Sequence, residues 1–210
     1  MKRLADLFRA QPAKREEAVT CAPSVEGLIR QLEDRDGVTR ERARRALATM
    51  GSPAVDALLA ALKHKKSGVR YEAAMSLRDI GDRRAVEGLV AALGDRSFEV
   101  RWVAAEALID AGRSAVPSVL HALLHHADSS WFRDGCHHVL SHFAGLDLHS
   151  AYHTEHHPAW VDYDLRDVLR PVVQALEGSG VASRAPVAAV RAMEHFPATT
   201  SRHDRHITPH

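Results

Sequence analysis

The chain has 210 residues, with 28 lysines and arginines against 27 aspartates and glutamates, so its formal net charge is +1. A balance this even gives no overall field to attract nucleic acid or an anionic membrane. Apolar residues make up 45% of the chain but aromatic residues only 5%, a composition that suits helices packed through alanine and leucine. Few runs alternate with period two, so we expect almost no β-strand.

The N-terminal segment, residues 1–22, has a short apolar face formed by Leu4, Leu7 and Phe8. We expect it to cap the open end of the structure that follows. Charged residues interrupt this face, which excludes a secretory signal peptide. The longest unbroken apolar run, Ala57–Leu62, is too short to span a bilayer. We therefore predict a cytoplasmic protein with no membrane partner.

A helical unit of about 30 residues repeats from residue 23 to residue 145. Its first helix begins with a valine–arginine pair, and Arg70 returns as Arg101, 31 residues later. Its second helix carries apolar residues at i, i+3, i+4 and i+7. Two helices in a period near 30 residues are typical of α-solenoids. We predict an all-α fold, a short right-handed α-solenoid of about four to five helix pairs. The four stripes are Val25, Leu28, Ile29, Leu32; Val55, Leu58, Leu59, Leu62; Val86, Leu89, Val90, Leu93; and Val116, Val119, Leu120, Leu123.

Small residues punctuate the repeat. Gly51, Gly81, Gly112 and Gly145 fall just past the arginine-bearing helices, where a left-handed residue would end each of them. Cys136 lies in the core alanine column, so we expect a small buried thiol.

These columns resemble the HEAT repeat, in the variant also seen in phycobilisome-lyase-like proteins. The resemblance rests on the valine–arginine opening of the first helix, its alanine–leucine core and the valine–leucine second helix. It covers about residues 23–145 and implies a ladder in which an acidic residue six positions before the arginine bonds to that arginine. Asp34–Arg40 and Asp95–Arg101 fit this pattern, whereas His64–Arg70 departs from it. A two-residue insertion leaves His125 or Asp128 as the candidate partner of Arg133.

The shape predicts a surface for a helix or an extended peptide. We expect the first helices on the convex face and the second helices on the concave face. Small side chains there, including Ala60 and Ala91, predict a shallow apolar groove. His121 and His125 lie at its C-terminal end, and histidines at that place would make recognition pH-sensitive.

Two aromatic residues form a second candidate contact. Tyr71 and Trp102 occupy the same column of successive first helices, off the main apolar stripe. They either offer a contact site or fill the seam between helices. Our leading hypothesis is a non-catalytic scaffold that binds another protein or a peptide and needs no cofactor.

A metal site is the first alternative. Ten of the fifteen histidines lie between residues 121 and 157, and several form i, i+4 pairs that place two imidazoles on one helical face. The competing interpretation is an ordinary solvated surface. Deoxyhypusine hydroxylase, which is also built of HEAT-like repeats, binds iron through His-Glu pairs after the repeat arginine, and no such pair follows these arginines. The candidate ligands for a transition metal are Asp134, His138, His142, His153 and His157.

Nucleic-acid binding is the second alternative. HEAT-like DNA glycosylases are similar in fold and use a basic groove. Here Lys63, Lys65, Lys66 and Arg96 lie in inter-helix turns and would give a basic edge. Because the whole chain is balanced in charge, this edge would attract phosphate only if it were concentrated.

The repeat pattern loosens after residue 145. We assign residues 146–196 to a His-rich loop followed by a C-terminal helical cap, and residues 197–210 to a disordered tail. Within the cap, Pro171 is expected to kink a helix or to restart it.

Overall fold

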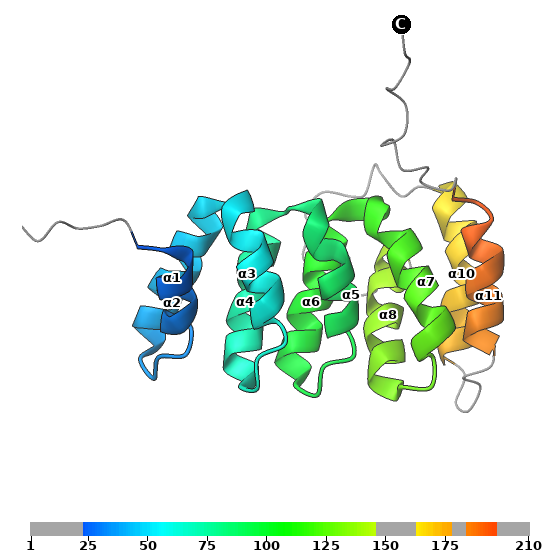
Figure 1. Ribbon diagram of the computed structural model, residues 1–210. Helices are drawn as coiled ribbons and strands as arrows, with labels where there is room; N and C mark the ends of the chain where they lie inside the picture. The colour runs from blue at the N-terminus through cyan, green and yellow to red at the C-terminus, as the bar shows by residue number, and fades with distance from the viewer. Residues whose placement is uncertain (1–22, 146–162, 178–183, 197–210) are drawn as a thin grey trace, which may run out of the picture.

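The computed structural model describes residues 23–145, 163–177 and 184–196. Within these ranges the chain forms helices and turns and no strand. Figure 1 shows the helix pairs stacked in one direction, from α1 and α2 at one end to α10 and α11 at the other. The predicted all-α solenoid is confirmed. The N-terminal cap, residues 146–162 of the His-rich loop and the C-terminal tail lie outside the described residues.

The helices form two rows. The row of longer helices consists of α2 (Gly37–Met50), α4 (Ser67–Ile80), α6 (Phe98–Asp110) and α8 (Ser130–Phe143). The row of shorter helices consists of α1 (Val25–Gln31), α3 (Val55–Ala61), α5 (Val86–Ala92) and α7 (Val116–His126). Short 3-10 turns at Ser52–Ala54, Arg83–Ala85 and Gly112–Ala115 lead into α3, α5 and α7.

The last helix pair enters the two rows in reverse order. α10 (Tyr163–Glu177) packs against α8, and α11 (Arg184–Met193) packs against α7. Pro171 lies inside α10, so the helix does not restart there, and the alternative expectation of a kink stays a prediction. Proline removes one donor from the helix ladder, but Pro171 is exposed, so water can reach the carbonyl that loses its partner.

Successive repeats pack most extensively through the row of longer helices. α4 packs against both α2 and α6, whereas the shorter helices α3 and α5 contact each other far less. The longer helices offer about twice the length for packing, so they carry most of the contact between the first repeats, and the assignment of the two rows to the convex and concave faces stays a prediction.

The predicted apolar stripes form the core. Leu58, Leu93 and Leu120 are fully buried, and the other stripe residues are buried or packed against the core. Cys136 is fully buried as predicted, and burial raises the pKa of its thiol. The four predicted helix-ending glycines, Gly51, Gly81, Gly112 and Gly145, all have positive φ.

One small residue allows two shorter helices to approach. A Cβ at Gly88 on α5 would overlap the Leu59 side chain of α3. The glycine therefore lets the Leu59 side chain pack directly against the α5 backbone.

Candidate partner-binding surface

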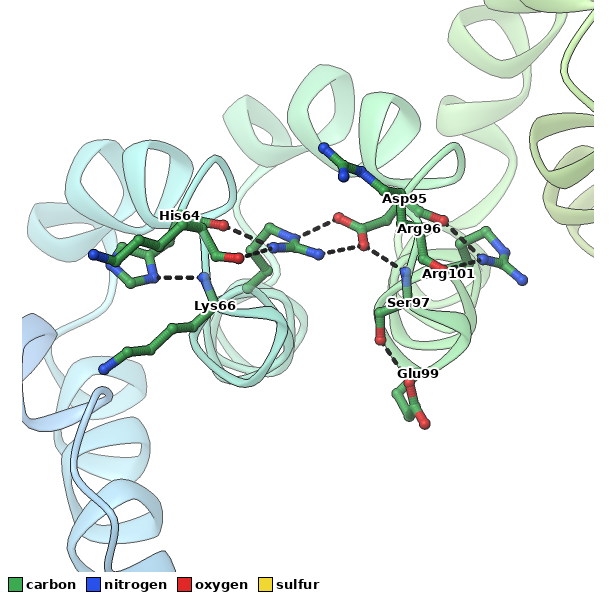
Figure 2. Close-up of polar contacts among 9 residues, drawn as sticks. His64, Lys66, Asp95, Arg96, Ser97, Glu99 and Arg101 are labelled. Atoms are coloured by element: carbon green, nitrogen blue, oxygen red, sulfur yellow. Dashed lines mark hydrogen bonds and ion pairs between the residues drawn. The ribbon is translucent and has the colours of Figure 1, made fainter.

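The repeat arginines fix the loops at one edge of the solenoid. Each donates from Nη1 to the carbonyl oxygen six residues earlier, and Figure 2 shows this bond for Arg101 and Asp95. Because the acceptor is main chain, the side chain at that position is free to vary. The bonds are Arg40 to Asp34 at 3.0 Å, Arg70 to His64 at 2.8 Å, Arg101 to Asp95 at 2.7 Å and Arg133 to Ala127 at 2.6 Å.

The predicted acid–arginine ladder is therefore wrong in its pairing. The Asp95 carboxylate bonds not to Arg101 of its own repeat but to Arg70 of the preceding repeat. Arg70 Nε lies 2.6 Å from Oδ2 and Nη2 lies 2.7 Å from Oδ1. In the fourth repeat the position six residues before the arginine belongs to Ala127, not to either residue suggested from the sequence.

The Arg70–Asp95 pair is largely shielded from water. The two side chains are 14% and 12% exposed, and the Ser97 amide donates to Asp95 Oδ1 at 2.8 Å. Burial by itself would raise the pKa of Asp95, but the hydrogen bonds from Arg70 and Ser97 outweigh it and lower the pKa below its ordinary value. The hydrogen bond to Asp95 in turn raises the pKa of Arg70.

Further ion pairs link successive helices in the row of longer helices. Arg44 of α2 pairs with Asp79 of α4. Arg78 of α4 lies 2.5 Å from Asp110 Oδ2 and 3.7 Å from Glu106 Oε2, both on α6. These contacts link α2 to α4 and α4 to α6 through charge.

Between α6 and α8 aromatic rings replace these arginine–carboxylate pairs. We define the aromatic patch as Phe98, Arg101, Trp102, Trp131 and His138. Phe98, Trp102 and Trp131 are 61%, 44% and 46% exposed, and they are three of the six large apolar residues exposed in the described ranges. The Trp102 ring lies 4.7 Å from the His138 ring and 6.1 Å from the Phe98 ring. Arg101 Cζ lies 5.8 Å and 5.3 Å from the ring centroids of Phe98 and Trp131.

The predicted partner-binding residues divide between two surfaces. Trp102 belongs to the aromatic patch, whereas Tyr71 is half-buried and packs against the core. The other four are exposed on the row of shorter helices, so the structure does not bring them together with Trp102. These four are Ala60 on α3, Ala91 on α5, and His121 and His125 on α7.

Phe98 and Trp131 were not predicted from the sequence. Phe98 lies three residues before its repeat arginine, at a position where the other repeats carry glycine or serine, and Trp131 lies two residues before its own. A large aromatic residue at the start of each of these helices is the signal that would have identified them.

The described part of the predicted metal site does not form a cluster. In the described ranges no three histidine, cysteine or acidic side chains lie close enough to hold a metal ion. His138 Nε2 lies 2.9 Å from Glu106 Oε1, and Asp134 is exposed while His142 is half-buried. The other two predicted ligands, His153 and His157, lie outside the described residues.

The predicted basic edge is mixed in charge. Lys66 Nζ lies 3.0 Å from Glu33 Oε2. The edge loops at residues 33–36, 63–66, 94–97 and 127–129 contain five basic and five acidic residues, so the edge as a whole is balanced in charge, although three of the basic residues share the loop 63–66. Lys63, Lys65 and Arg96 are exposed within this mixed edge.

Comparison with known proteins identifies the repeats. The profile of HEAT repeats matches residues 25–109 and residues 69–141, which together make up more than half of the chain. The match does not single out the phycobilisome-lyase-like variant. The crystal structure of an engineered protein is similar at 22% identity, covering 81% of this chain and 79% of that chain, with a TM-score of 0.35; a likeness at that score carries no argument. No curated protein sequence matches the chain.

As to membranes, none of the helices in the described ranges has both the length and the apolar character needed to cross a bilayer.

Proposed function

This chain belongs to the HEAT-repeat family, and on that premise we propose that it is a non-catalytic scaffold that binds a segment of a partner protein on the aromatic patch. The observation that carries the proposal is the group of three exposed aromatic rings, two of which flank one arginine. Tryptophan and arginine are the residues most enriched where protein interfaces gain their binding energy.

The patch is held on a rigid base. The helices that carry it belong to the core: Val100 of α6 and Cys136 of α8 are fully buried, and α6 packs against both α4 and α8. Nη1 of Arg101 is fixed by the Asp95 and Arg96 carbonyls at 2.7 Å and 3.2 Å. Groups held in place before binding lose little entropy when a partner arrives, so this surface suits recognition of a peptide or helix.

The test is a selection of displayed random 12-residue peptides on the purified chain, followed by affinity measurements on variants. We expect Trp102→Ala and Trp131→Ala each to weaken the selected peptides by about 30-fold, the size of an interface hot spot near 2 kcal/mol. Isothermal titration calorimetry gives the affinities, and circular dichroism shows that the variants remain folded.

Val187→Ala is the matched control, because Val187 is 56% exposed on α11, outside the patch. It should leave peptide affinity unchanged. Peptides that tolerate both tryptophan changes but lose affinity with Ala91→Arg or His121→Ala would move the binding surface to the row of shorter helices and contradict the proposal.

A further inference from the structure

Arg101 has unused hydrogen-bonding capacity within the aromatic patch. Its Nη1 bonds to two carbonyl oxygens, but among the described residues no hydrogen bond or carboxylate reaches its Nε or Nη2. Arg70, one repeat earlier, uses these same two nitrogens to hold Asp95. Figure 2 shows Arg101 bonded to main-chain oxygens of the loop, on the far side of the loop from the Asp95 carboxylate.

Arg101 lacks a carboxylate partner because Ala127 occupies the position where that carboxylate would lie. Arg133 donates to the Ala127 carbonyl at 2.6 Å as Arg101 donates to the Asp95 carbonyl at 2.7 Å, so Ala127 occupies in its repeat the position that Asp95 occupies in the preceding one. The repeat that follows Arg101 therefore presents a methyl group where Arg70 meets a carboxylate. Ala127 is buried, and the guanidinium of Arg101 instead lies beside Trp131.

The nearby acid Glu99 is already engaged. Its Oε2 accepts a hydrogen bond from the Ser97 hydroxyl at 2.5 Å. This bond is the largest cause of the lowered pKa of Glu99, and the charge of Arg101 contributes least.

The other repeat arginines lack this combination. Arg40 Nε lies 3.5 Å from Glu72 Oε1, so it has an acid within reach. Arg133 has no carboxylate partner among the described residues, but no described aromatic ring lies over its guanidinium. Among the repeat arginines, only Arg101 joins an unfilled pair of donors to two neighbouring aromatic rings within the described ranges.

We propose that the partner segment is acidic: an aspartate or glutamate of the bound protein pairs with Nε and Nη2 of Arg101, and an adjacent apolar side chain packs on Trp102 or Trp131. The proposal rests on the function proposed above and names the chemistry of its partner. A guanidinium binds a carboxylate through two parallel charge-assisted hydrogen bonds, and the Arg70–Asp95 pair shows that geometry in the same chain.

The test uses the same displayed 12-residue library and the full chain. Peptides that depend on Trp102 should be enriched in an aspartate or glutamate next to an aromatic or aliphatic residue. In a synthetic copy of a selected peptide, changing that acid to its amide should weaken binding at least 10-fold. Arg101→Gln should weaken the acidic peptide by a similar factor and should bring the peptide and its amide form to nearly equal affinity.

Ala127→Asp gives the sharpest result, because it supplies in the chain itself the carboxylate that Arg101 lacks. It should weaken the acidic peptide at least 10-fold, while Ala127→Asn, which has nearly the same volume and no charge, should cost less than about threefold. Thermal unfolding of both variants verifies the fold. If Ala127→Asp does not fold, the comparison of Arg101→Gln with the amide form of the peptide decides the question.

The outcomes separate the two proposals. Peptides that require Trp102 but carry no acid and tolerate Ala127→Asp would overturn the acidic partner and leave the aromatic surface standing. A selection without any Trp102-dependent peptide would overturn the proposed function itself. Concentration-dependent dimerisation in sedimentation that Ala127→Asp abolishes would make a second copy of the chain the occupant and would overturn the assignment to a different protein.

Discussion

Replacing Arg70 with methionine should lower the free energy of unfolding by about 3–5 kcal/mol, the usual cost of removing one partner from a shielded ion pair. The side chain donates to the Asp95 carboxylate twice and to the carbonyls of His64 and Lys65. Methionine makes none of these bonds and leaves Asp95, 12% exposed, with the Ser97 amide as its remaining donor. Urea denaturation followed by circular dichroism measures the loss.

The pH dependence of the unfolding free energy provides a second test of this prediction. The pKa of Asp95 is lowered in the folded chain, so the stability that its ionised form contributes is present above the ordinary aspartate pKa near 4. It is lost as the pH falls through the lowered value. In Arg70→Met the burial of Asp95 opposes ionisation. The difference in unfolding free energy between the wild-type chain and the variant should therefore shrink as the pH is lowered below about 4.

Lys66→Met is the matched control. Lys66 and Glu33 also form an ion pair between neighbouring repeats, but their side chains are 53% and 39% exposed. Exposed pairs of this kind contribute about 0–1 kcal/mol. A loss in Arg70→Met as small as that in Lys66→Met would mean that the Arg70–Asp95 pair does not join the repeats.

The helices were predictable because their pattern is local. An apolar stripe with helical spacing buries one face of a helix, and all four stripes lie in or against the core. The glycines that follow the arginine-bearing helices were equally readable, since a left-handed residue such as Gly81, with φ of 66°, follows from chain geometry alone.

The arginine ladder shows where local spacing misleads. The resemblance to HEAT repeats implied a bond within one repeat between Asp95 and Arg101, six residues apart, and the bond exists but uses the main chain. The carboxylate instead reaches Arg70, 25 residues away in the sequence. Only the stacking of repeats brings those two groups together, and no spacing within one repeat encodes it.

The aromatic patch was half predictable for a related reason. Trp102 was found because it shares a column with Tyr71, but the two residues differ in the fold: Tyr71 packs against the core and Trp102 is 44% exposed. Phe98 and Trp131 lie outside any repeating column. Phe98 lies three residues before Arg101 on α6 itself, whereas the proximity of Trp131 to Arg101 follows from the way α8 packs against α6.

Replacing Leu89 with alanine should lower the free energy of unfolding by about 2–5 kcal/mol, because it leaves a cavity in a packed core. Leu89 is 3% exposed in α5, and α5 packs against both α6 and α7. In a solenoid each repeat is stabilised by its neighbours, so a cavity here weakens the centre of the array. The matched control is Ala91→Ser on the exposed side of the same helix, expected to change stability by no more than about 0.5 kcal/mol. Thermal and urea unfolding of both variants measure the contrast, and equal losses would show that the inward face of α5 is assigned incorrectly.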